Sequence, residues 1–123
     1  MGKRILLVED FDDARSMMRF EIENLGHSVI EATNGDEAVS VALSSKPDLI
    51  LMDICMPGKD GLEATKEILS TDFLKETPIV AVTALGDSCG DQALAMGCRE
   101  VVNKPLDTST LSDVIERNSQ KNR

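Results

Sequence analysis

The chain has 123 residues, with 22 acidic against 13 basic side chains and a formal net charge of −9. This length fits one domain of ordinary size. The acid excess argues against a protein that docks on nucleic acid or on an anionic membrane. Aromatic residues are scarce, because the sequence has 3 Phe and no Tyr or Trp. The core must therefore be aliphatic, and we expect Met17, Met18 and Met52 to belong to it.

The cysteines and the N-terminus indicate a reducing compartment. Cys55, Cys89 and Cys98 are odd in number and lack CxxC spacing, which argues against a disulfide framework or a zinc site. The apolar run at the N-terminus is too short for a signal peptide. We expect a cytoplasmic protein, and the start at Met1 favours a natural stand-alone chain.

The first half of the chain predicts three strands and two helices. Apolar runs at 5–8 and 49–52 have the length and composition of buried strands, and 27–32 is expected to form the strand between them in the sequence. Apolar residues at helical spacing predict a helix over 12–25. A second helix is expected after Asn34, which has the side chain of an N-cap.

The second half continues the alternation. It predicts a helix at 60–71, a strand at 78–82, a weaker helix at 87–96, a short strand at 101–102 and a helix at 108–118. Five strands that alternate with five helices predict an α/β fold, in which a parallel sheet is covered by helices on both faces.

Polar side chains follow four of these strands. Glu9 and Asp10 come after the first, Asp53 after the third, Thr83 after the fourth and Lys104 after the fifth. Parallel sheets bind ligands beyond the carboxyl ends of their strands. Three carboxylates together repel one another, and Mg²⁺ relieves that repulsion. With a lysine and a hydroxyl added, the set suits phosphoryl transfer, and Asp53 on the central strand is the favoured nucleophile.

Four motifs occur in order, each after a predicted strand: LVED at 7–10, DICMPGKDG at 53–61, VTA at 82–84 and NKPL at 103–106. In these motifs the chain resembles the response-regulator receiver domain of two-component signalling, over nearly its whole length. The resemblance implies a single receiver domain spanning 1–123. It also implies a doubly wound, flavodoxin-like parallel sheet of strand order 2-1-3-4-5 with five helices.

The resemblance further implies the chemistry of the site. Asp53 matches the aspartate that accepts a phosphoryl group from a sensor histidine kinase or a His-phosphotransfer protein. Asp10, Asp53 and the backbone carbonyl of Cys55 match the direct ligands of Mg²⁺, for which Mn²⁺ can substitute. Glu9 matches the neighbour that holds the metal through water. Such a domain is not an enzyme beyond its own phosphorylation and dephosphorylation.

The switch follows from the same resemblance, with one departure. Thr83 matches the hydroxyl that turns toward the phosphoryl group, Lys104 matches the lysine that bridges to it, and the bond before Pro105 is expected to be cis. The family usually carries an aromatic residue in the fifth strand where this chain has Val101. We hypothesise that movement of a late-starting fourth helix replaces the ring. Downstream protein targets are expected on the face formed by the fourth helix, fifth strand and fifth helix.

Three alternatives remain open. A dehalogenase-like phosphatase needs an aspartate two residues after its nucleophile, where this chain has Cys55. A flavodoxin-like cofactor binder needs a phosphate-binding loop rich in Ser, Thr and Gly, whereas residues 9–13 are largely acidic. A degenerate receiver would act without phosphorylation as a protein-interaction module, although the acceptor-site residues are present.

Overall fold

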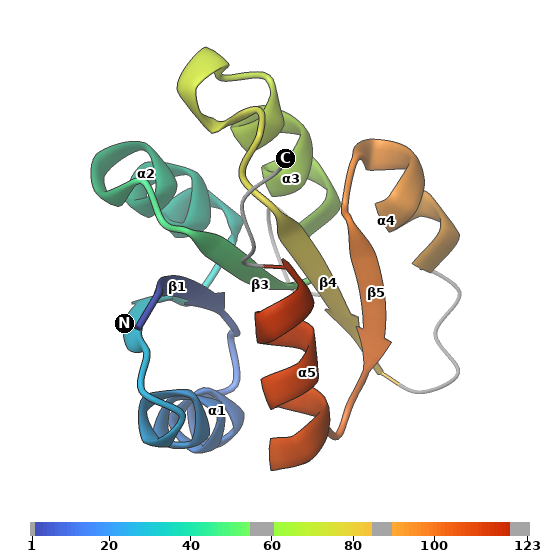
Figure 1. The fold of residues 1–123 in the computed structure, drawn as a ribbon. Helices are drawn as coiled ribbons and strands as arrows, with labels where there is room; N and C mark the ends of the chain where they lie inside the picture. Colours follow the sequence, from blue (N-terminus) through green and yellow to red (C-terminus); the bar gives the residue numbers. More distant parts are fainter. Residues whose placement is uncertain (1, 55–60, 85–89, 119–123) are drawn as a thin grey trace.

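A computed structural model of the chain describes residues 2–54, 61–84 and 90–118. Its five parallel strands form one sheet in the order β2-β1-β3-β4-β5, as predicted (Figure 1). The strands are β1 (Arg4–Val8), β2 (Ser28–Ala32), β3 (Leu49–Asp53), β4 (Ile79–Thr83) and β5 (Glu100–Asn103).

Five α-helices connect or follow the strands. They are α1 (Asp12–Asn24), α2 (Gly35–Ser45), α3 (Gly61–Leu69), α4 (Gly90–Met96) and α5 (Thr108–Asn118). The helix predicted to reach residue 71 ends at Leu69, and a short 3₁₀ helix, η1 (Asp72–Leu74), follows it. The predicted start of the fourth helix at Asp87 lies outside the described residues. In the described part of the chain, no helix is long and apolar enough to cross a membrane.

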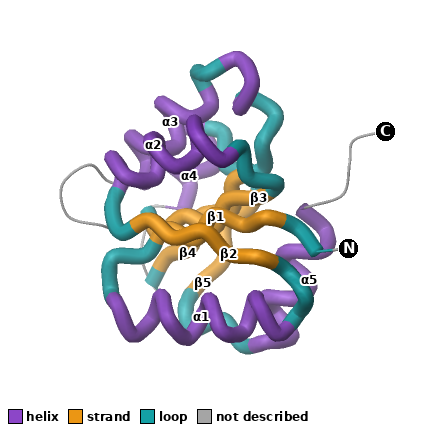
Figure 2. The backbone as a smooth tube through the Cα atoms, turned by 90° about the vertical axis from the view of Figure 1, so that its left-hand side faces the viewer, coloured by secondary structure: helices purple, strands orange, loops and turns teal. Residues whose placement is uncertain are grey.

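The helices form two layers around the sheet. Helices α2, α3 and α4 cover one face, and α1 and α5 cover the other (Figure 2). Every residue of β3 is buried. A central strand covered on both faces has no side chain directed to water, which explains its unbroken apolar run.

The prediction for the methionines is only partly correct. Met52 is fully buried and Met18 packs against the core on the α1–α5 face, but Met17 is 66% exposed. Adjacent positions on a helix point about 100° apart, so α1 directs only one of its two methionines at the sheet. The three phenylalanines are exposed as well, and the described core is aliphatic as expected.

The N-cap predicted for the second helix is present in α2. The Asn34 side chain accepts a hydrogen bond from the backbone N–H of Glu37 at 2.8 Å. The Glu37 carboxylate in turn accepts from the backbone N–H and the hydroxyl of Thr33, both at 2.7 Å. The bond to Asn34 satisfies a donor that the first turn of a helix leaves without an intrahelical partner, and the bonds from Thr33 tie Glu37 to the residue before the N-cap.

Candidate functional site

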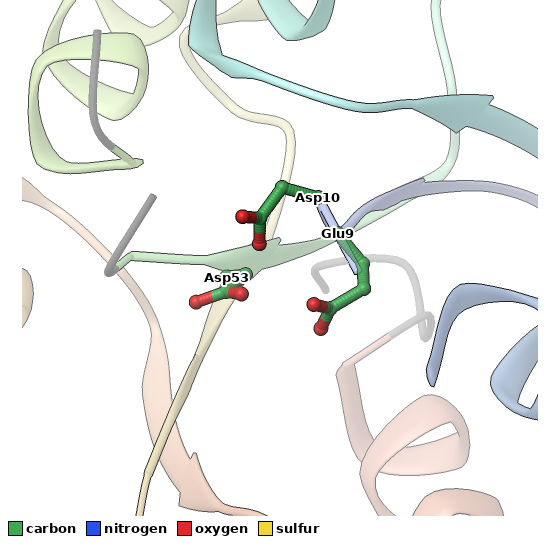
Figure 3. Close-up of side chains that lie close together, drawn as sticks. All are labelled: Glu9, Asp10 and Asp53. Atoms are coloured by element: carbon green, nitrogen blue, oxygen red, sulfur yellow. The ribbon is translucent and has the colours of Figure 1, made fainter. Parts of the chain in front are cut away.

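One edge of the sheet gathers the predicted site residues. Because all five strands run parallel, their carboxyl ends lie at the same edge. Glu9 and Asp10 directly follow β1 there, and Asp53 ends β3. Figure 3 shows the three carboxylates beside one another. One oxygen from each lies within 4.8 Å of those from the other two. The structure therefore assembles the acidic cluster that the sequence predicted.

Lys104 joins this cluster from the residue after β5. Its Nζ lies 2.8 Å from Oε1 of Glu9 and 3.2 Å from Oδ2 of Asp53. The Glu9 and Asp53 side chains are only 2% and 5% exposed, whereas that of Lys104 is 32% exposed. Burial lowers the pKa of Lys104, but the hydrogen bond to Glu9 and the charges of both acids outweigh it and raise that pKa. The ammonium group thus stays charged and stabilises two carboxylates that have little access to water.

The same cluster has the composition of a divalent-cation site. Mg²⁺ prefers carboxylate oxygens together with water. The site offers three carboxylates, two of them nearly buried, against one lysine. A small hard cation would therefore complete the charge balance. Of the predicted ligands, Glu9, Asp10 and Asp53 are brought together, and Cys55 lies outside the described residues.

The predicted switch residues lie on β4 and β5. Thr83 is 1% exposed, and its Oγ1 accepts a hydrogen bond from Nδ2 of Asn103 at 2.8 Å. Val101 is half-buried against the core on the α2–α3–α4 face. A methyl group added to Gly90 would lie 3.3 Å from Cγ1 of Val101, so the start of α4 packs on this valine. The bond between Lys104 and Pro105 is cis, as expected.

Arg15 is a site residue that sequence reasoning missed. Its side chain extends from α1 and is 14% exposed. Nη1 donates a hydrogen bond to the backbone carbonyl of Glu9, after β1, at 3.0 Å. Nε donates to Glu31 at 2.8 Å and Nη2 donates to Asp12 at 2.7 Å. The guanidinium therefore ties the loop after β1 to α1 and β2. The sequence carries no signal for this role, because a single arginine on a helix is usually a solvated side chain.

Gly61 is a second such residue. A methyl group built on its Cα would lie 2.5 Å from the backbone oxygen of Asp53 and 2.5 Å from Cα of Ile54. Side chains essentially never approach a backbone this closely. Only glycine allows the start of α3 to approach the end of β3 in this way. The motif at 53–61 includes this glycine, but the need for glycine at this position becomes visible only in the packing of α3 against β3.

Comparison with known proteins agrees with this geometry. The family model described as the response regulator receiver domain matches residues 5–116. The polar-differentiation response regulator DivK of Brucella anthropi is 35% identical over 117 residues, covering 94% of this chain and 95% of that protein. The chemotaxis protein CheY of Thermotoga maritima is 35% identical over 122 residues, covering 98% of this chain and 100% of that one.

A solved structure gives the same result. The receiver domain of a sensor histidine kinase from Pseudomonas aeruginosa PAO1, with a magnesium ion coordinated in its active site cleft, superposes with a TM-score of 0.90 at 31% identity. The match covers 97% of this chain and 98% of that one. Receiver domains bind Mg²⁺ at an acidic pocket, and Glu9, Asp10 and Asp53 form an acidic group that could hold a metal here. The chain belongs to the response-regulator receiver domains of two-component signalling.

Proposed function

We propose that this chain, as a single receiver domain over 1–123, accepts a phosphoryl group on Asp53. The observation that carries the proposal is the environment of this carboxylate. It is nearly buried at the end of the central strand, 3.2 Å from Nζ of Lys104, and beside two further carboxylates. A phosphoryl group arriving here would meet a fixed positive charge, and Mg²⁺ would supply the remaining charge stabilisation for its oxygens.

The donor is a phosphohistidine on a sensor histidine kinase or a His-phosphotransfer protein. An oxygen of Asp53 attacks phosphorus, an acyl phosphate bond forms, and the bond from phosphorus to the histidine nitrogen breaks. The nitrogen leaves with the bonding electron pair. The residues that would hold Mg²⁺, or Mn²⁺ in its place, are Asp10, Asp53, the Cys55 carbonyl and, through water, Glu9. The family is one of non-catalytic signalling domains, and the proposal requires no other substrate.

Signalling follows from the contacts that the new phosphoryl group makes. Lys104 is already beside Asp53 and bridges to the group, while the hydroxyl of Thr83 turns toward it. A change of a few kcal/mol is sufficient to shift a two-state equilibrium and thereby alter partner binding. The proposed output surface for downstream proteins is the face of α4, β5 and α5. On that surface Val101 takes the place of the usual aromatic residue. We also propose that the protein acts in the cytoplasm.

Phosphorylation with small donors tests the proposal. The protein is incubated with Mg²⁺ and either acetyl phosphate or phosphoramidate, whose P–N bond resembles that of phosphohistidine. Intact mass is expected to rise by one phosphate. Asp53→Asn is expected to abolish the increase, whereas Asp13→Asn, which changes an exposed acid on α1, should leave it intact.

The same measurement separates the alternative of a degenerate receiver. If the unaltered protein gains no mass with either donor, the proposal is wrong and the alternative of a phosphorylation-independent interaction module is favoured. Chelation of Mg²⁺ is expected to stop the reaction, and full activity without divalent cations would contradict the metal part of the proposal.

A further inference from the structure

Asn103 and Thr83 are joined by a hydrogen bond between side chains at the site. The two residues are direct partners in the β4–β5 register. Nδ2 of Asn103 lies 2.8 Å from Oγ1 of Thr83, within the normal range for such a bond. Thr83 is almost fully buried, whereas Asn103 is exposed. The amide therefore holds a hydroxyl that has almost no contact with water.

The alternation of side chains along the strands gives this bond its direction. Ala81 and Val101 are partners two residues earlier, and both pack in the core on the α2–α3–α4 face. Residues two apart on a strand share a face, so Thr83 and Asn103 belong to that face as well. Leu51 packs on the opposite, α1–α5 face of the sheet, so Asp53, two residues later, points to that face.

These two directions are in conflict. A hydroxyl that turns toward a phosphoryl group on Asp53 must move away from the face on which Asn103 holds it. The resting position of Thr83 is thus stabilised by a bond that the switched position lacks. The next residue, Lys104, contacts Asp53. Two consecutive side chains therefore hold Thr83 and the proposed acceptor, from the last residue of β5 and the residue after it.

We propose that Asn103 is a positioning residue that holds Thr83 in its resting orientation and opposes the switch. This inference rests on the proposed function of Asp53. In this inference Asn103 on β5 controls the orientation of Thr83. Val101 cannot do so by a hydrogen bond or a ring rotation, because valine has no polar group and one stiff torsion. One hydrogen bond of this kind changes an equilibrium constant by about two- to tenfold, which is the size of the effect expected.

The first test needs no phosphorylation. In the unmodified protein, the side-chain amide protons of Asn103 are expected to show slowed solvent exchange in NMR spectra, and Thr83→Val should remove the slowing. The side-chain amide of Asn24, exposed at the end of α1, serves as the unprotected reference. Equal exchange of the two amides would overturn the inference.

The second test measures the switch itself. Beryllium trifluoride bonds to a carboxylate oxygen and forms a tetrahedral group similar to a phosphoryl group. Its binding to Asp53 in the presence of Mg²⁺ is measured by calorimetry. Asn103→Leu, which keeps the approximate shape but removes the donor, should bind it about two- to tenfold more tightly than the unaltered protein. In a Thr83→Val background the same substitution should have no effect, which isolates the pair as a double-mutant cycle. Asn24→Leu is the control and should leave the affinity unchanged.

The outcomes distinguish this inference from the proposed function. If the unaltered protein is phosphorylated on Asp53 but Asn103→Leu binds beryllium fluoride equally or more weakly, the inference is wrong and the proposed function stands. An equal effect of Asn103→Leu in both Thr83 backgrounds also overturns it. If the unaltered protein accepts neither phosphoryl group nor beryllium fluoride, both fail together.

Discussion

The Cα of Gly61 approaches the backbone of Asp53 so closely that a methyl group there would lie 2.5 Å from the carbonyl oxygen. This contact joins the first residue of α3 to the last residue of β3. The position of Asp53, the proposed phosphoryl acceptor, thus depends on a neighbouring residue that has no side chain. Backbone atoms cannot move aside as a flexible side chain can.

Substitution of Gly61 by alanine is therefore expected to be costly. Overpacking of this kind lowers the free energy of unfolding by about 1–3 kcal/mol, which urea denaturation measures. Gly90→Ala is the matched control, because the nearest atoms that its methyl group would meet in the described part of the chain belong to the Val101 side chain, the first at 3.3 Å. The higher helix propensity of alanine offsets that contact, so a change below about 1 kcal/mol is expected. Equal losses for the two variants would contradict the argument.

Lys104→Met is expected to destabilise the protein and to strengthen its response to metal. Removal of the ammonium group leaves Glu9 and Asp53 without its hydrogen bonds, at a cost of about 1–3 kcal/mol at pH 7. Mg²⁺ should then raise the melting temperature more in the variant than in the unaltered protein, because no lysine competes for the carboxylates. Lys75→Met, which changes an exposed lysine after η1, is the control. A smaller response to Mg²⁺ in Lys104→Met would show that the lysine is not a competing cation.

Arg15→Met is expected to weaken Mg²⁺ binding without removing a predicted ligand. The loss of one hydrogen bond to the Glu9 carbonyl should reduce the affinity by about three- to tenfold, as measured by calorimetric titration. Arg19→Met provides a close control, because Arg19 also pairs with Glu31 but bonds to Glu23 where Arg15 bonds to Glu9. If both variants lost affinity equally, the effect would belong to the ion-pair network rather than to the loop after β1.

Glu31→Gln should reveal a pH-dependent contribution to stability. The hydrogen bond from Arg19 lowers the pKa of Glu31, burial opposes this, and Arg15 adds to the lowering. Because the folded-state pKa lies below its ordinary value of 4.5, the carboxylate stabilises the fold above that pH. The stabilisation is lost as pH falls through the folded-state pKa.

The unaltered protein should therefore exceed Glu31→Gln in stability by about 1 kcal/mol at pH 7, and the difference should shrink below pH 4.5. Urea unfolding across this range measures it. Glu76→Gln, an exposed acid after η1, should show little difference at any pH. A constant difference for Glu31→Gln across the range would exclude ionisation as its cause.

Much of the fold was predictable from local patterns. The run at 49–52 indicated a strand covered on both faces, and β3 is buried along its whole length. Asn34 caps α2 as its side chain suggested. The prediction for Met17 was wrong. The scarcity of aromatic residues indicates that methionines fill the core, but it does not indicate whether Met17 or Met18 faces the sheet.

The sequence by itself determined the order of strands and helices and the identity of the acidic residues that follow the strands. Hydrophobic periodicity and strand-end chemistry are local, so they can be recognised without coordinates. Tertiary structure alone decided that the Lys104 ammonium lies between Glu9 and Asp53 within contact of both, that Arg15 holds the Glu9 carbonyl and that Asn103 donates to Thr83. Such contacts depend on the register of paired strands and the direction of each side chain, which arise only when the sheet and its helices have packed together.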